Sequence, residues 1–180
     1  MSQEPYEGGK RRIDQILAAG FADDLDSLEL DELRRRRDLC RGEREYLSLL
    51  RRFLQGRRDL LRDERERRVG GGKPGEIIER VSAVLAGEGS RGPSRGEAVM
   101  VSLPDEEITL ARRRVERLLS DARLSDLANI EQAELEAAIT RLDEEERTIS
   151  DKRAAVMSVH DRLQDEIKER WRTQLRGTAS

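Results

Sequence analysis

Residues 30–68 decide the fold, and their sequence is LDELRRRRDLCRGEREYLSLLRRFLQGRRDLLRDERERR. One column of apolar residues in this stretch recurs every seven positions and consists of Leu33, Cys40, Leu47, Leu54 and Leu61. A second column lies one position before the first and consists of Leu39, Tyr46, Phe53 and Leu60. A seven-residue apolar period is typical of helices that pack along a coiled-coil seam. We therefore predict one long helix from about Leu30 to about Arg68, with a seam that is widened on one side.

The same pattern returns 102 residues later in the chain. Lys10 to Arg68 aligns without a gap with Arg112 to Arg170, and the second seven-residue column consists of Leu135, Leu142, Ile149, Val156 and Leu163. Polar residues repeat as well, because Ser48, Arg51 and Asp59 return as Ser150, Arg153 and Asp161. A repeat that keeps polar as well as apolar positions indicates that both helices present one chemical face, to a pseudo-symmetric ligand or partner.

This internal duplication organises the whole chain. Before the first long helix we expect a short helix at 10–19 that ends at Gly20, with Ser27 as the cap of the long helix. Before the second, Pro104 opens a helix over about 105–122, and Asn129 with Gln132 resembles a capping box for a helix that ends near Thr173. The expected segments are a disordered tail at 1–9, repeat 1 at 10–68, a flexible linker with one candidate short helix at 69–103, repeat 2 at 104–173 and a tail at 174–180.

Two rods of equal length joined by a long loop are expected to pair in antiparallel fashion. The predicted fold class is therefore all-α, with two long helices in an antiparallel coiled-coil hairpin plus short accessory helices. The composition agrees, because 36% hydrophobic, 3% aromatic and 41% charged residues suit long helices that each bury one stripe. Two copies in one chain make a monomer the natural state before any partner binds.

Charge and cysteine content narrow the function classes. A formal net charge of −3 argues against a general polyanion binder, so we expect no direct binding to DNA. The single cysteine, Cys40, excludes an internal disulfide and fits a reducing compartment. We find no signal peptide and no apolar run near the roughly 18 residues that a membrane span needs, so a cytoplasmic protein without membrane contact is expected.

The first polar row consists of Arg44, Ser48, Arg51, Gln55 and Asp59. On a helix with about 100° per residue these side chains fall within an arc of roughly 80°, beside the apolar seam. Arginine donates two parallel hydrogen bonds to O6 and N7 of guanine. A carboxylate can accept from guanine N1–H and N2–H. Two such rows on antiparallel helices would match a twofold-symmetric guanine nucleotide.

The second polar row consists of Glu146, Ser150, Arg153, Met157 and Asp161. The spacing Glu-x3-Ser-x2-Arg-x3-Gln-x3-Asp, once per long helix, resembles the signature of the RsiG anti-sigma factors. Each row departs from that signature once, with Arg44 in the glutamate position of the first row and Met157 in the glutamine position of the second. The serine, arginine and aspartate positions are intact in both rows.

The resemblance implies a function and its ligands. Proteins of the RsiG family bind cyclic di-GMP, as an intercalated dimer, and in that state sequester the sporulation sigma factor WhiG. The ten residues of the two polar rows would bind the nucleotide, and the outer surface with the short helices would contact the sigma factor. No nucleophile–base pair and no metal cluster is evident in the sequence, so we do not expect an enzyme.

Simpler interpretations stay open for the same residues. The rows can be solvated helix faces with intrahelical pairs such as Arg51 to Gln55, and the chain a ligand-independent coiled-coil scaffold or adaptor. His160 is the only histidine and is not expected to bind metal. The Arg34–Arg37 run is interpreted as a solvated face, with an acidic contact on the sigma factor as the alternative. Trp171 is expected either to anchor a partner or to cover the end of the hairpin.

Overall fold

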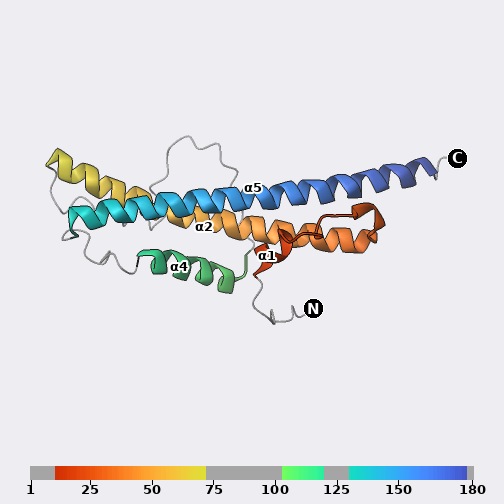
Figure 1. Ribbon diagram of the computed structural model, residues 1–180, viewed down its shortest axis with the longest axis horizontal. Helices are drawn as coiled ribbons and strands as arrows, with labels where there is room; N and C mark the ends of the chain where they lie inside the picture. The colour runs from red at the N-terminus through yellow and green to blue at the C-terminus, as the bar shows by residue number, and fades with distance from the viewer. Residues whose placement is uncertain (1–10, 72–102, 120–129, 178–180) are drawn as a thin grey trace. The chain divides into compact units, whose positions relative to one another are not determined.

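The computed structural model describes residues 11–71, 103–119 and 130–177, and within them the chain is helical with no strand. The elements in chain order are α1 (Arg12–Ile16), the short 3-10 helix η1 (Leu25–Ser27), α2 (Leu30–Gly70), α4 (Asp105–Leu119) and α5 (Gln132–Gly177) (Figure 1). The two long helices predicted from the sequence are thus present. The predicted linker and its candidate short helix lie almost entirely outside the described residues.

The chain divides into two compact units, and both long helices contribute to each. Unit 1 comprises Met1–Leu47 and Ser150–Ser180, and unit 2 comprises Ser48–Ile149. Unit 1 therefore contains α1, η1, the first part of α2 and the last part of α5. Unit 2 contains the rest of α2 and α5 together with α4.

The seven-residue columns form the core of each unit, as the sequence predicts. In unit 1 the buried members are Leu33, Cys40, Leu47, Val156 and Leu163. In unit 2 they are Leu54, Leu61, Leu135, Leu142 and Ile149. None of the ten is more than 2% exposed, and full burial of an aliphatic side chain contributes about 1.5–3 kcal/mol. The second column, with Tyr46 and Phe53, is half-buried, which places it at the edge of the seam.

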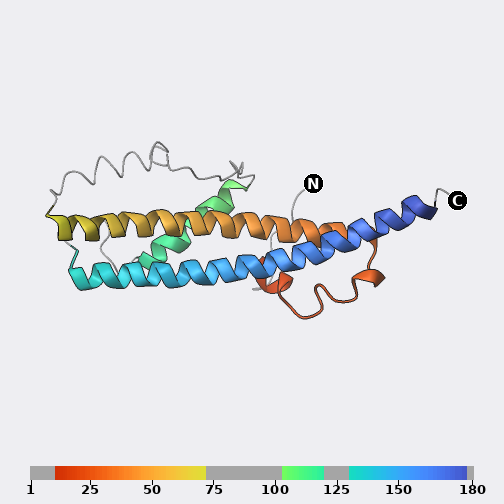
Figure 2. The same ribbon diagram turned by 90° about the horizontal axis from the view of Figure 1, so that it is seen from above.

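In unit 2, α2 and α5 lie side by side, as Figures 1 and 2 show. Their cross-helix partners run in opposite order, because Arg51 pairs with Glu146, Arg62 with Asp143, and Arg68 with Gln132. Short α4 contacts both long helices. Arg114 of α4 pairs with Glu145 of α5 at 2.6 Å, and the Arg112 guanidinium lies 5.8 Å from the ring centroid of Phe53 on α2. Ala111 and Val115 bury the apolar side of α4.

In unit 1, arginines hold the segment between α1 and α2. Arg36 donates to the Phe21 carbonyl at 2.6 Å, and its guanidinium lies 5.3 Å from the Phe21 ring. Arg162 of α5 donates to the Ala22 carbonyl. Arg170 of α5 donates to the carbonyls of Leu25, Asp26 and Leu28. These bonds give charged donors to main-chain carbonyls of the segment between α1 and α2.

Helix α1 packs against α2, and the end of the Arg12 side chain lies over a glycine of α2. Ile13 and Ile16 of α1 are buried, and Arg12 forms an ion pair with the buried Glu43 at 3.8 Å. A Cβ atom at Gly42 would lie only 2.8 Å from Nη1 of Arg12. The absence of a side chain at Gly42 therefore gives the Arg12 side chain its place against α2.

Several helix boundaries differ from the sequence predictions. Ser27 does not cap α2, because α2 begins at Leu30 and the Ser27 hydroxyl donates to the Asp24 carbonyl at 2.7 Å. Helix α1 ends at Ile16, well before Gly20, which has a positive φ of 87°. Helix α5 continues past the predicted end at 173 to Gly177. Asn129, the first residue of the predicted capping box, and the last residues of the helix expected over about 105–122 lie outside the described residues.

The Arg34–Arg37 run is not simply a solvated face. Arg34 pairs with Asp31, Arg35 and Arg36 pair with Glu32, and Arg37 pairs with Asp38, at 2.7–3.0 Å. Only 19% of the Arg36 side chain is exposed, because it also covers Phe21. The sequence pattern predicted neither the ion pair of Arg36 with Glu32 nor its contact with the Phe21 ring.

Candidate ligand-binding site

The ten residues of the two polar rows separate into two groups, one in each unit. The unit 2 set consists of Ser48, Arg51, Gln55, Asp59 and Glu146. The unit 1 set consists of Arg44, Ser150, Arg153, Met157 and Asp161. Each set thus combines residues from α2 and α5, in contrast to the rows, which each belong to one helix.

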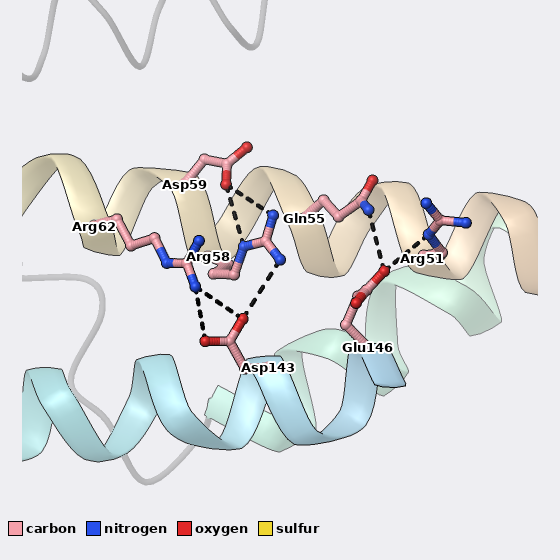
Figure 3. A network of polar contacts seen from close by, with 7 residues as sticks. All are labelled: Arg51, Gln55, Arg58, Asp59, Arg62, Asp143 and Glu146. Carbon is pink, nitrogen blue, oxygen red and sulfur yellow. Dashed lines mark hydrogen bonds and ion pairs between the residues drawn. The ribbon is translucent and has the colours of Figure 1, made fainter. Parts of the chain in front are cut away.

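Glu146 connects the two helices within the unit 2 set (Figure 3). Its Oε1 atom accepts a hydrogen bond from Nε2 of Gln55 at 3.1 Å and lies 2.8 Å from Nε of Arg51. The contact with Arg51 is an ion pair that lacks the alignment of a hydrogen bond. Arg51 and Gln55 are four residues apart, so they share one face of α2. The expected intrahelical pair of Arg51 with Gln55 is therefore replaced by a shared partner on α5.

A second cluster that the sequence analysis missed lies next to the unit 2 set. Asp143 accepts hydrogen bonds from Arg58 at 3.4 Å and from Arg62 at 2.8 and 3.1 Å (Figure 3). Arg58 also donates to Oδ1 of Asp59 at 3.2 Å. Asp59 therefore pairs with Arg58, its neighbour in the chain, and 64% of the Asp59 side chain is exposed. Arg58 and Arg62 follow Arg51 and Gln55 by seven residues each, and this heptad spacing is the signal that could have found them.

The unit 1 set lies on the corresponding parts of α2 and α5. Arg44, Ser150, Arg153 and Met157 are half-buried, whereas Asp161 is exposed. Oδ1 of Asp161 lies 3.1 Å from Nδ1 of His160. The only histidine of the chain thus contacts a member of the set.

Two buried groups outside the sets, Glu64 and Cys40, have shifted pKa values. Glu64 is completely buried and accepts hydrogen bonds from Arg67 and Arg68, which lower the pKa of its carboxyl. Burial raises the pKa of the Cys40 thiol to about 11. A thiol with so high a pKa is a packing group rather than a nucleophile, in agreement with its expected place in the core.

Within 11–71, 103–119 and 130–177, no three histidine, cysteine, aspartate or glutamate side chains are placed to hold a metal ion. In the same ranges no helix combines the length and the apolar character that crossing a bilayer requires.

The family comparison covers most of the first repeat and part of the segment that follows it. A family model described as RsiG-like matches residues 19–85. This stretch is less than half of the 180-residue chain. The matched RsiG-like stretch contains all of α2 and the first polar row, whereas the second polar row lies outside it. The RsiG resemblance inferred from the sequence is thereby confirmed, and it indicates an anti-sigma factor with a sigma factor as its partner.

A search of curated proteins finds no match to the chain. The RsiG-like family is one of regulators, and together with the all-helical fold it suggests a binding protein rather than an enzyme. The unit 2 set offers an arginine, an amide and a carboxylate at one place on two helices. Such a group can donate to and accept from a polar ligand at the same time.

Proposed function

We propose that this chain is an anti-sigma factor that binds cyclic di-GMP through the two polar rows and, when loaded, sequesters a WhiG-type sigma factor to repress sporulation genes. The observation that carries the proposal is the meeting of Arg51, Gln55 and Glu146 in unit 2, in a chain whose α2 lies within the RsiG-like match. Glu146 on α5 thus contacts both Arg51 and Gln55 on α2, and all three residues were singled out for guanine chemistry from the sequence.

The chemistry of these residues supports a guanine nucleotide. The arginine fork matches guanine O6 and N7 and also matches phosphate oxygens, and a carboxylate accepts from the guanine N1–H and N2–H donors. Guanine bases stack, so the site would accommodate the nucleotide as an intercalated dimer. A ligand that binds the partner-competent state more tightly raises the affinity for the sigma factor by linkage.

The proposal includes the architecture of the long helices. We infer an antiparallel coiled-coil hairpin produced by internal duplication, monomeric and cytoplasmic before partner binding. The opposite order of the ion-pair partners in unit 2 supports the antiparallel pairing there. The burial of matching residues such as Leu33 and Leu135, which are 102 positions apart, supports the duplication.

Calorimetric titration tests the nucleotide. We expect purified protein to bind cyclic di-GMP at about two nucleotides per chain and to discriminate against GTP and cyclic di-AMP. Arg153→Ala and Asp161→Ala should abolish binding, whereas Arg147→Ala and Asp151→Ala, at exposed positions of α5 outside the rows, should bind normally. Circular dichroism should show equal helix content in all four variants. Unchanged affinity in both row variants would refute the assignment of the site.

A pull-down tests the partner. The sigma factor should be retained by the chain with cyclic di-GMP and lost without it. The Arg153→Ala variant should not retain it at any nucleotide concentration, since its site is disabled.

A ligand-independent scaffold is the second candidate function. The pairing of Arg51 with Glu146, and of Arg58 and Arg62 with Asp143, is the type of salt bridge that flanks ordinary coiled coils. A scaffold predicts that the row residues can be exchanged for Glu or Lys at little cost. Full retention of the sigma factor without nucleotide would favour it over the proposed sensor.

A further inference from the structure

The short helix of each repeat is joined to the long helix of the same repeat by an equivalent ion pair. In unit 1, Nε of Arg12 on α1 lies 3.8 Å from Oε2 of Glu43 on α2. In unit 2, Nη2 of Arg114 on α4 lies 2.6 Å from Oε1 of Glu145 on α5. The second arginine and the second glutamate each follow the first by 102 residues, which is the offset between the two repeats. The same contact is therefore present at corresponding positions of both repeats.

Both ion pairs are partly shielded from solvent and lie beside buried apolar side chains. Only 7% of the Glu43 side chain and 19% of the Glu145 side chain are exposed. The residues that follow the two arginines, Ile13 and Val115, are both buried. A carboxylate that is largely removed from water is costly to leave without a cationic partner. Each ion pair thus helps to fix a short helix on a long helix.

In unit 2 the short helix also contacts the other long helix. Figure 2 shows α4 crossing the α2–α5 pair of unit 2 at an angle. The Arg112 guanidinium of α4 lies 5.8 Å from the ring centroid of Phe53 on α2, within the range of a cation–π attraction. Arg112 therefore attaches α4 to α2, and Arg114 attaches it to α5. Two attachments on one short helix limit how far α2 and α5 can separate at this point.

The attachment points of α4 lie next to the contact between Glu146 and α2. Glu145 directly precedes Glu146, and Phe53 lies between Arg51 and Gln55 in the sequence. Successive residues of a helix point about 100° apart, so α4 and the Glu146 contact use adjacent sides of the same turns. Oε1 of Glu146 meets its two partners at 2.8 and 3.1 Å, and such short contacts depend on the spacing of the two helices.

We propose that α4 is a clasp whose closure positions the Glu146 carboxylate against α2. Arg114 and Glu145 are positioning residues, and their ion pair closes the clasp. The closed clasp holds α5 at the distance from α2 at which Glu146 meets both of its partners. For its effect on nucleotide affinity this inference rests on the proposed function. A ligand that binds unit 2 more tightly when the clasp is closed also stabilises the closed clasp, by linkage.

Amide hydrogen exchange of the full chain without ligand tests the clasp itself. Arg114→Ala should accelerate exchange about tenfold or more over 105–119 and to a smaller extent over 143–149, because α4 is released and α5 loses its contact there. Arg12→Ala removes the equivalent arginine of unit 1, so it should accelerate exchange over 12–16 and leave 105–119 unchanged. Arg113→Ala, at an exposed position of α4, is the matched control and should exchange as the wild type does.

Calorimetric titration with cyclic di-GMP tests the positioning role. Arg114→Ala and Glu145→Ala should each weaken binding about five- to tenfold, and the double variant should bind no more weakly than either, since all three lack the same interaction. The exchanged pair, Arg114→Glu with Glu145→Arg, should restore most of the affinity. A purely structural role would lower the free energy of unfolding and leave the affinity unchanged at a temperature where circular dichroism shows every variant to be folded.

Two results would overturn the clasp while the proposed function stands. One is wild-type exchange over 105–119 in Arg114→Ala, and the other is accelerated exchange there with unchanged affinity for cyclic di-GMP. A wild-type chain that binds no cyclic di-GMP would overturn the proposed function instead. Exchange over 143–149 in Arg114→Ala would then still decide whether α4 positions α5, because that measurement needs no ligand.

Discussion

In unit 2 the arginines of α2 pair with carboxylates of α5, whereas in unit 1 arginines of α2 and α5 donate to main-chain carbonyls between Phe21 and Leu28. Arg62 and Asp143 represent the first arrangement, with N–O distances of 2.8 and 3.1 Å. Arg170 represents the second, with three carbonyl acceptors and Glu166 on its own helix. Arginine thus connects α2 to α5 in unit 2, whereas in unit 1 it connects the long helices to the segment between α1 and α2.

The difference shows what the arginine fork can do with two kinds of acceptor. A carboxylate partner carries charge, so its attraction to arginine falls with added salt and with acid. A carbonyl partner carries no charge, but it is costly to leave without a donor once it is shielded from water. Removal of a unit 1 contact should therefore cost more free energy of unfolding than removal of a unit 2 ion pair, and this cost should depend less on salt.

Replacement of Arg170 should have the largest effect. In Arg170→Ala the carbonyls of Leu25, Asp26 and Leu28 lose their charged donor, and we expect a loss of about 2 kcal/mol in the free energy of unfolding. Urea unfolding followed by circular dichroism measures this loss, and amide hydrogen exchange should accelerate within residues 21–28.

Arg172→Ala is the control for Arg170→Ala. Arg172 lies on the same helix, forms an exposed pair with Glu169 and should contribute less than about 0.5 kcal/mol. Equal losses in the two variants would mean that the carbonyl contacts of Arg170 contribute nothing specific.

Replacement of Asp143 should have an intermediate effect. Asp143→Asn removes the charge that attracts Arg58 and Arg62, and 25% of the Asp143 side chain is exposed, so we expect a loss of about 1 kcal/mol at low salt. The difference from the wild type should shrink as salt is raised, because the ion pairs are screened. Glu144→Gln, on the exposed side of α5, is the matched control. A loss that does not change with salt would argue against the electrostatic account of unit 2.

Replacement of Glu32 should have the smallest effect. Glu32 accepts a hydrogen bond from Arg36, and Arg36 in turn donates to the Phe21 carbonyl. Hydrogen bonds from Arg35 and Arg36 lower the pKa of Glu32 from 4.5 to about 2, and Arg36 also holds the Phe21 carbonyl. A carboxyl with a lowered pKa in the folded state stabilises fully above pH 4.5, and that contribution disappears as the pH falls toward 2. It should be below about 1 kcal/mol, since the paired groups are partly exposed.

Acid titration of stability measures the Glu32 contribution. Glu32→Gln should lose less stability than the wild type between pH 4.5 and 2, whereas Glu29→Gln, at an exposed position before α2, should follow the wild type. Parallel curves for Glu32→Gln and the wild type would show that Arg35 and Arg36 do not depend on this carboxylate.

The sequence predicted the core of both units because the apolar period is local and long. Every member of the two seven-residue columns is buried, from Leu33 to Leu163. The segment between α1 and α2 was predicted poorly, since Ser27 was assigned as a cap and Arg36 as a solvated side chain. A main-chain carbonyl has no signature in the sequence, so an arginine that binds one looks like any charged surface residue.

The candidate site was predictable on each helix but not between helices. The helical periodicity of about 100° per residue placed Arg51 and Gln55 on one face of α2, and in the structure both contact Glu146. Their partner Glu146 depends on the register of α5 against α2, which a pattern within one helix does not contain. Asp143 was missed for the same reason, and Arg58 and Arg62 were missed although they follow Arg51 and Gln55 of the first row by seven residues.

Cys40 makes the core of unit 1 open to a kinetic measurement. The chain contains one sulfhydryl, which is fully buried in the seam, and its pKa is raised to about 11. A thiol reagent can modify it at neutral pH only during excursions in which the seam separates and the thiolate forms. The labelling rate therefore reports how often the helices separate around Leu33 and Leu47. Mass spectrometry measures this rate on the unmodified sequence.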